Sequence, residues 1–399
     1  MLKKILITIL IASLTAITFT GCWDRKELNE VGIVLAIGID KDEKSGGYLL
    51  SSQIIRPEAL SKNSSGREAP FETVITSGET LFQAIRNTVK EFDRRSIFSH
   101  VTVILVSEEL ARQGLDDITD FISRSQELRK STWLMITSGA KAYEVINIEH
   151  GLAKVQAGYM EGIIKKQKIN SYATTTTVID FIKKMPGEGI HPVAGVFKTI
   201  KTDKITPEKN LESSEGLMLS GTAVFNKSKL VGFLDEDETF GLNMITGNKK
   251  RALINLPTPK DKQEVLSIEI TKIKSKFSPS VKNNRYSFKI DVEVEGNLTE
   301  IKDGIDVSNP DEFEKLNEKL SQLLLTKINS SIKKIQGDFR TDVIGFGSAI
   351  QRKHPKDWKK IKDKWDTVFP DVSYSIHVKS SLKGTGLLIK SIDVVKKKE

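Results

Sequence analysis

Histidine and cysteine are the side chains whose spacing would first reveal catalysis or metal binding, and this chain offers few of them. Its 399 residues include five histidines and one cysteine. The histidines lie far apart and form no His-Glu-x-x-His motif, so the sequence shows no zinc-binding pattern of that kind. A thiolate zinc site or an internal disulfide would need at least two cysteines, so both are excluded. The histidines are His100, His150, His191, His354 and His377.

Patterns for covalent catalysis or phosphate binding are equally weak. Ser-x-x-Lys occurs at Ser138 and again at Ser330, but its companion Lys-Thr-Gly is missing. Gly345-Phe346-Gly347 lacks the third glycine of a dinucleotide-binding loop. We therefore expect no catalytic residue, no metal site and no cofactor, and we interpret the chain as a non-enzyme.

The single cysteine, Cys22, indicates chemistry of a different kind. Lys3 and Lys4 precede an uncharged apolar stretch over residues 5–18, and small residues stand just before the cysteine. This order is typical of a secretory signal. The segment resembles the lipobox of bacterial lipoproteins, whose Cys thiol takes a diacylglycerol and becomes the first residue of the mature chain. Phe19 stands where that motif usually has Leu.

We therefore expect residues 1–21 to be a signal peptide that is removed, and Cys22 to carry the lipid anchor. Two acyl chains give stable attachment to a membrane, whereas one gives only reversible binding. No later segment approaches about 18 consecutive apolar residues, the length that a spanning helix needs. The mature protein is thus expected to be tethered at one end.

Composition limits the remaining classes. Hydrophobic residues make up 38% of the chain, and the formal net charge is +9. That surplus is spread too thinly along the chain for a nucleic-acid-binding protein, and export also opposes that role. The length predicts two or three domains at roughly 100–200 residues each.

The first strands read as a hairpin. Residues 31–39 and 48–55 are β-branched runs on either side of a charged, glycine-bearing turn. Because a hairpin needs neighbouring strands, we expect strands within residues 192–256 to complete its sheet. The predicted first domain is therefore discontinuous. It comprises residues 22–57 and 190–258.

Helices and strands alternate over the next segment, residues 73–168, which predicts an inserted α/β domain. Residues 58–70 before it are rich in turn formers and read as an exposed loop.

Residues 262–399 have the clearest periods and predict a C-terminal α+β domain. Phe288, Ile290 and Val292 alternate with polar residues, as in a strand with one wet face. Asn309-Pro310 begins a long helix whose apolar face runs to Ile335. A last strand is expected at 387–395. The fold class is thus α+β: three domains, each with a small, mostly antiparallel or mixed sheet and flanking helices.

One segment of this domain is basic and carries two tryptophans. Trp358 and Trp365 share a helical face, and lysines fill the other positions. Such a helix could lie on an anionic membrane or contact a partner. The favoured interpretation is an ordinary surface helix whose tryptophans pack into the domain. The candidate contact residues are Lys356, Lys359, Lys360, Lys362 and Lys364.

The opening of the mature chain carries a resemblance to a known family. Residues 21–28, Gly-Cys-Trp-Asp-Arg-Lys-Glu-Leu, and 31–40, Val-Gly-Ile-Val-Leu-Ala-Ile-Gly-Ile-Asp, closely resemble the start of the Ger(x)C lipoproteins, the C subunits of spore germinant receptors. Weaker matches follow in order, among them residues 221–225, 232–234 and 342–347.

The resemblance implies a non-catalytic lipoprotein subunit on the outer face of the inner spore membrane. It would work beside the two integral or membrane-associated subunits of the same receptor and would be needed for the germination response to nutrients. Two other classes stay open from the residues alone. A solute-binding lipoprotein of an uptake system would show two similar α/β lobes around a cleft. An anchored wall-modifying enzyme would need a catalytic constellation.

Overall fold

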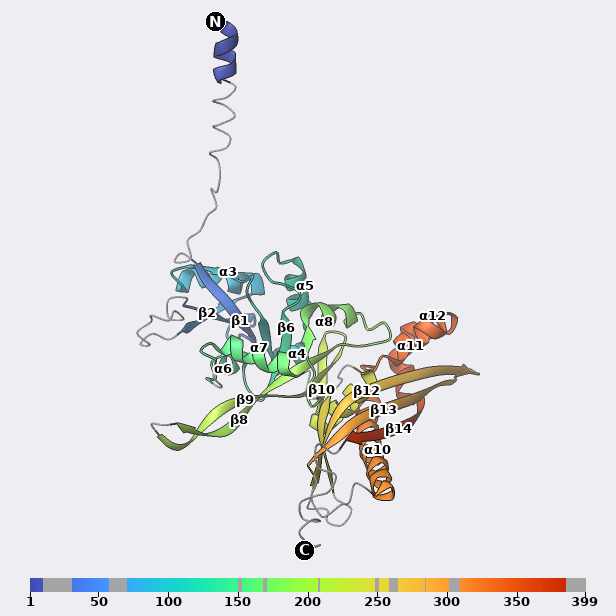
Figure 1. Ribbon diagram of the computed structural model, residues 1–399. Coiled ribbons are helices and arrows are strands. Elements are labelled where there is room, and N and C mark those ends of the chain that lie inside the picture. Colours follow the sequence, from blue (N-terminus) through green and yellow to red (C-terminus); the bar gives the residue numbers. More distant parts are fainter. Residues whose placement is uncertain are drawn as a thin grey trace.

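The structure is a computed structural model, and its strands form two sheets that helices cover (Figure 1). Within the described residues, one sheet has ten strands and the other has four. The mixed α and β fold class is therefore confirmed. The structure describes residues 1–9, 31–56, 70–149, 153–167, 171–206, 209–247, 251–257, 265–283, 285–300 and 309–384.

Some predicted features fall outside these residues. They are the lipobox around Cys22, nearly all of the loop at 58–70 and the strand at 387–395. Residues 2–9 of the predicted signal peptide are helical. In the described part of the chain, no helix combines the length and the apolar character that crossing a membrane requires.

The centre of the large sheet is parallel. Its strands β1, β5, β6 and β8 are neighbours in that order, and the β5 sequence Val-Ile-Leu-Val-Ser is buried throughout. Continuous apolar runs suit strands that helices cover on both faces. The bounds are β1 (Val31–Lys41), β5 (Val103–Ser107), β6 (Trp133–Ser138) and β8 (Val193–Thr206).

Antiparallel strands extend the large sheet on both sides. On one side β2 pairs with β1 and β3 with β2, and on the other β9 pairs with β8 and β10 with β9. Two short strands lie off this path, with β4 parallel to β1 and β7 antiparallel to β6. The bounds are β2 (Tyr48–Ile55), β3 (Phe71–Gly78), β4 (Arg95–Ile97), β7 (Thr176–Thr177), β9 (Lys209–Asn226) and β10 (Lys229–Leu234).

This pairing corrects one expectation. Strands from residues 192–256 do not pair directly with the first hairpin, because the second edge of β1 is taken by β5, with Ala36 opposite Val103. The uninterrupted apolar run of β1 suits a central strand better than a strand of an isolated hairpin. β8 joins the same sheet through β6 instead. The first hairpin and the inserted segment thus share one sheet, whereas the domain boundaries themselves stay a prediction.

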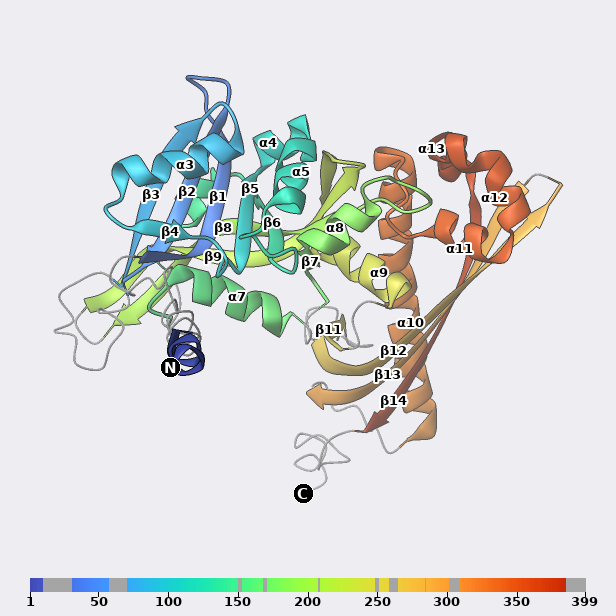
Figure 2. The same cartoon turned by 90° about the horizontal axis from the view of Figure 1, so that it is seen from above.

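Helices cover both faces of the large sheet (Figure 2). Residues of α3, α4, α5 and α8 pack in the core on one face, and residues of α6 and α7 pack on the other. The bounds are α3 (Leu81–Glu91), α4 (Glu108–Gln113), α5 (Asp116–Arg124), α6 (Ala142–Val145), α7 (Gln156–Lys166) and α8 (Val178–Lys184).

The four-stranded sheet follows the alternation that the sequence predicted. Phe288, Ile290 and Val292 of β13 are buried against α10, whose N-cap Asn309 accepts a hydrogen bond from Asp311 N. The order is β11-β12-β13-β14, antiparallel except for the parallel pair β13–β14. The bounds are β11 (Ala252–Pro257), β12 (Val265–Lys282), β13 (Arg285–Glu300), β14 (Ser373–Gly384), α10 (Pro310–Lys333) and its continuation η2 (Lys334–Phe339).

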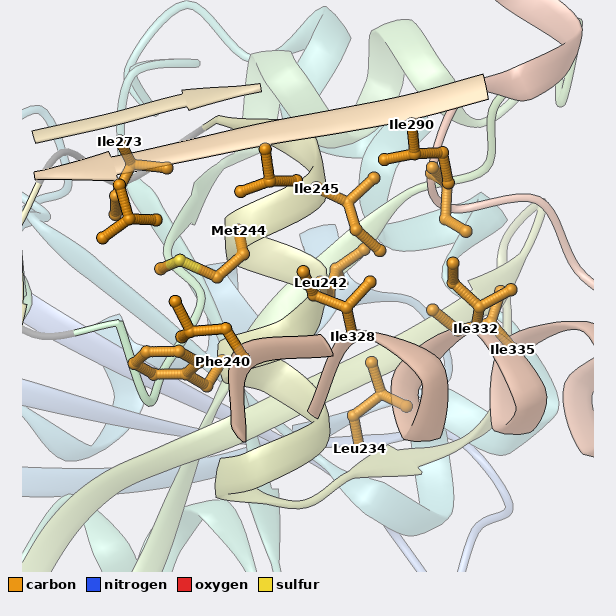
Figure 3. Packing of buried hydrophobic residues seen from close by; sticks show 14 of the residues in the cluster. Leu234, Phe240, Leu242, Met244, Ile245, Ile273, Ile290, Ile328, Ile332 and Ile335 are labelled. Carbon is orange, nitrogen blue, oxygen red and sulfur yellow. The ribbon is translucent and has the colours of Figure 1, made fainter. Parts of the chain in front are cut away.

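Helix α9 (Glu236–Thr246) joins the two parts of the molecule. It follows β10 of the large sheet, yet its Phe240, Leu242 and Met244 pack in one core with Ile328 and Ile332 of α10 (Figure 3). All its residues from 239 to 245 are buried, as expected of a helix with neighbours on every side. The two sheets therefore share a continuous hydrophobic core.

Candidate functional site

The five candidate lysines lie on a chain of short helices after α10. These helices stand at the opposite end of the molecule from α3 in both views (Figures 1 and 2). All five lysine side chains are exposed. The helices are α11 (Phe346–Lys353), α12 (Pro355–Ile361), η3 (Lys362–Lys364), α13 (Trp365–Val368) and η4 (Phe369–Asp371).

The tryptophans of this segment face inward. Trp358 is 4% exposed and Trp365 is 2% exposed, and their rings meet edge to face with centroids 5.5 Å apart. The surface-helix interpretation favoured from the sequence is confirmed. The lysine surface consequently lacks the exposed aromatic side that a helix lying in a membrane interface would use.

Acidic residues break up the charge of the lysine surface. Residues 355–371 contain five lysines and four aspartates. Lys360 Nζ lies 3.1 Å from Asp357 Oδ1, within one helical turn. The segment is therefore only weakly basic overall, which suits contact with a protein of mixed charge better than binding to a uniformly anionic surface.

A buried aspartate fixes the start of this segment. Asp342 Oδ1 accepts hydrogen bonds from the backbone N–H groups of residues 344, 345 and 346 at 3.1, 2.7 and 3.2 Å. Its Oδ2 accepts from Gly347 N at 2.8 Å and from Trp365 Nε1 at 3.0 Å. Burial raises the pKa of Asp342, but every one of these bonds is donated to it, which stabilises the carboxylate and opposes that rise. Asp342 thus ties the N-terminus of α11 to the tryptophan core.

A buried histidine connects the segment to the large sheet. His191 Nδ1 lies 3.0 Å from the Lys227 backbone nitrogen, which can only donate, so Nδ1 accepts and the proton is on Nε2. Nε2 then donates to Asp366 Oδ1 at 3.0 Å. That hydrogen bond lowers the pKa of Asp366. The backbone N–H of His191 also donates to the Asp342 carbonyl at 2.7 Å.

The loop that carries His191 comes very close to α11. Ser348 N donates to the Gly189 carbonyl at 2.8 Å. A Cβ atom added to Gly347 would lie 2.5 Å from Gly189 Cα, and Gly189 has a φ of +79°. Only glycine fits both the conformation and the spacing. The segment that carries the lysine surface is therefore in close backbone contact with the loop that leads into β8.

Sequence reasoning did not assign this junction of Asp342, His191 and Asp366. The run Asp342-Val343-Ile344-Gly345-Phe346-Gly347 drew notice only as an incomplete glycine-rich loop and as a family match. The available signal was an acid just before glycines at a helix start, where backbone N–H groups gather.

The lysine of one Ser-x-x-Lys pattern is engaged in ion pairs. Lys141 of the Ser-x-x-Lys pattern lies 2.6 Å from Glu109 and 3.1 Å from Glu43. Hydrogen bonds to these two carboxylates raise the pKa of Lys141, which favours its charged form. Within the described ranges, no three His, Cys, Asp or Glu side chains gather in a way that could hold a metal ion. His150 lies outside those ranges.

Comparison with known proteins covers most of the chain. Residues 24–199 match the family described as "Spore germination protein N-terminal domain", and residues 220–386 match "Spore germination B3/GerAC like, C-terminal". Spore germination protein KC of Bacillus subtilis is 28% identical over 399 residues, which cover 97% of each chain. Spore germination protein B3 of the same organism is 26% identical over 366 residues, 90% of this chain and 92% of that protein.

A solved structure shows the same fold. The crystal structure of the GerBC protein matches with a TM-score of 0.52 and 21% identity, over 90% of this chain and 99% of that one.

Proposed function

The chain belongs to the Ger(x)C family of spore germination proteins, and from this premise we propose that it is the lipid-anchored C subunit of a nutrient germinant receptor. It is attached through Cys22 to the outer face of the inner spore membrane. It acts beside the two integral or membrane-associated subunits of the same receptor, and the germination response to nutrients requires it.

The full-length match to spore germination protein KC carries this proposal. Both family segments occur in order, and the aligned region covers 97% of each chain. If the two proteins shared only one module, the aligned region would cover only part of each chain. The similarity therefore supports a common role for the whole chain.

The position of Cys22 supports the anchor. It is the only cysteine of the chain and follows an apolar run with lysines before it. Eight residues lie between it and Val31, where β1 begins, so nine residue-to-residue steps join the two. A fully extended segment of that length spans about 30 Å, so the folded part stays close to the membrane surface.

A role in assembly accords with how the charged groups are used. Asp342, His191 and Asp366 hold the lysine surface in place, and Lys141 is paired with carboxylates. Lys356, Lys359, Lys360, Lys362 and Lys364 are the proposed contact residues toward a partner subunit. Tethering raises the local concentration of the partners, so each contact can be individually modest.

The alternative of a solute-binding lipoprotein has less support. That class has two similar lobes around a cleft. In the described part of this chain, one sheet has ten strands with a parallel centre and the other has four, so the two parts are unlike.

The decisive experiment is affinity purification from detergent-solubilised spore membranes, with the tagged full chain as bait and mass spectrometry as readout. We expect two membrane proteins, the other subunits of the receptor, to co-purify in comparable amounts. Recovery of a permease and an ATPase of an uptake system instead would establish the solute-binding alternative.

A further inference from the structure

Helix α3 has a second apolar face that the fold leaves uncovered. Leu81, Ala84 and Thr88 are buried against the sheet. Phe82 and Val89, seven residues apart and so on one side of the helix, are 52% and 63% exposed. A helix that needed only to cover the sheet would carry polar residues at these two positions.

This face continues into a groove between α3 and α5. The groove has a volume of 440 Å³ and is lined by Phe82, Val89 and Phe121, with the buried Phe98 and Leu128 among its deeper residues. The rings of Phe82 and Phe121 are neighbours in its lining, tilted by 52° with centroids 6.3 Å apart. The surface is therefore apolar and preformed.

Arginines surround the apolar residues. Arg86, Arg95 and Arg124 line the groove together with one acid, Glu127. The Arg86 guanidinium lies over the Phe82 ring at 5.1 Å, and Arg124 is bonded to Asp120 at 2.9 Å. Exposed Phe and Val beside arginine is the composition with which peripheral proteins enter an anionic bilayer surface. The rings enter the acyl boundary and the arginine stems lie along it.

The groove lies where the chain enters the fold. Val31, the first residue of β1, pairs with Arg95 of β4, and Arg95 lines the groove. In Figure 1, α3 and α5 stand at the end of the molecule where β1 begins. Only residues 23–30 lie between Cys22 and this point in the sequence.

We propose that the α3–α5 face docks directly on an anionic membrane surface, with Phe82 and Val89 inserted and Arg86 and Arg95 against lipid phosphates. The proposal rests on the proposed function in that Cys22 supplies the anchor. The lipid anchor limits the distance between the folded chain and the membrane, and the α3–α5 face determines which side of the protein lies on the membrane. The lysine surface at the other end of the molecule is then left accessible to a partner subunit.

Site-directed fluorescence quenching tests this with the full-length lipidated protein. Cys22 is blocked by its lipid, so Phe82→Cys, Val89→Cys and the control Leu253→Cys each provide one reactive thiol for a polarity-sensitive dye. Leu253 on β11 is 54% exposed and serves as a matched site outside the face. The protein is reconstituted in phosphatidylcholine vesicles with and without phosphatidylglycerol, and nitroxide-labelled lipids are the quencher.

We expect severalfold stronger quenching at positions 82 and 89 than at 253, and a loss of that difference without phosphatidylglycerol. Arg86→Glu with Arg95→Glu should abolish it, whereas the charge-matched pair Lys359→Glu with Lys362→Glu should not. Equal quenching at all three sites would overturn the docking proposal. So would labels at 82 and 89 that become shielded only when the receptor's membrane subunits are added, because the occupant is then a protein. Failure of the protein to float with vesicles at all would instead refute the anchor.

Discussion

His191 and Asp366, 175 positions apart in the sequence, are joined by a hydrogen bond of 3.0 Å from Nε2 to Oδ1. His191 is fully buried just before β8, whereas Asp366 lies in α13 on the surface of the C-terminal part. The segment that carries the lysine surface is therefore connected to the start of β8 by a buried side chain.

Two helical glycines, one packed between α9 and α10 and one with open space around it, should respond in opposite ways to substitution by alanine. A Cβ on Gly241 would overlap Ser331 Oγ and the Lys327 carbonyl, so Gly241→Ala should lower the free energy of unfolding by about 1–3 kcal/mol. Gly162 in α7 has open space around it, and Gly162→Ala should raise that free energy by about 0.5–1 kcal/mol. Urea denaturation of both variants measures this. Equal effects of the same sign would contradict the packing described.

Replacement of Asp342 by asparagine should destabilise the protein. In Asp342→Asn one of the two carboxylate oxygens is replaced by an NH2 group, which can only donate. In one orientation this group faces Gly347 N and Trp365 Nε1. In the other it faces the backbone N–H groups of residues 344, 345 and 346. Two or more buried donors then lose their acceptor, at about 1–3 kcal/mol each, so we expect a loss of at least about 2 kcal/mol in the free energy of unfolding. Asp363→Asn is the control, because Asp363 is 89% exposed. Near-UV circular dichroism during urea titration follows the tryptophans. A midpoint equal to that of the control would refute the role of Asp342.

Glu295 gives the four-stranded sheet a pH dependence. Hydrogen bonds from Lys272 at 2.8 Å and Lys383 at 2.7 Å lower the pKa of Glu295 to about 2. In the unfolded chain its pKa is about 4.3, so the stabilisation is present above that pH and is lost as the pH falls toward 2. Unfolding midpoints of wild type and Glu295→Gln should therefore differ at pH 6 and converge on acidification. Lys272→Gln and Lys383→Gln should each reduce the difference. A difference that does not change with pH would exclude this origin.

Cys22→Ala should abolish lipidation and reduce germination in response to nutrients, because two acyl chains supply most of the membrane affinity. Phe19→Leu is the matched control, since it brings the segment closer to the lipobox pattern and should leave lipidation intact. Fractionation of spore membranes and the fall in optical density during germination are the measurements. Normal germination with the variant in the soluble fraction would argue against the anchor.

Charge reversal of Lys359, Lys360 and Lys362 should reduce germination without changing the far-UV circular dichroism, because these side chains are exposed and the fold does not depend on them. Reversal of Lys274, Lys276 and Lys379, which are exposed on β12 and β14, makes the same charge change elsewhere. We expect the first triple variant to recover less of the membrane subunits in a pull-down. Equal effects of both triples would mean that overall charge, and not this surface, matters.

Local periodicity predicted much of the fold, because a strand or helix with one buried face shows that face in its own sequence. The alternation of Phe288, Ile290 and Val292 and the apolar face of α10 required no knowledge of partners. The strands that lie beside β1, by contrast, could not be predicted without knowing which segments pair. The run from Val31 indicates a buried strand but does not say which strands lie beside it, and only the tertiary structure placed Val103 opposite Ala36.

The junction and the α3 face were beyond sequence reasoning for the same reason. Asp342 is an ordinary loop acid until five donors converge on it, and His191 gains its partner from a segment far along the chain. The exposure of Phe82 depends on which elements pack beside α3, and only the folded chain shows it.

The central position of β1 has a mechanical consequence. Tension on the chain before Val31 pulls along a strand that is hydrogen-bonded on both sides, to β2 on one and to β4 and β5 on the other. Force along the strand loads these ladders in shear, so many hydrogen bonds must yield together, whereas an edge strand pulled sideways would peel off bond by bond. The end of the fold at which the chain enters β1 is therefore built to resist a pull along the strand.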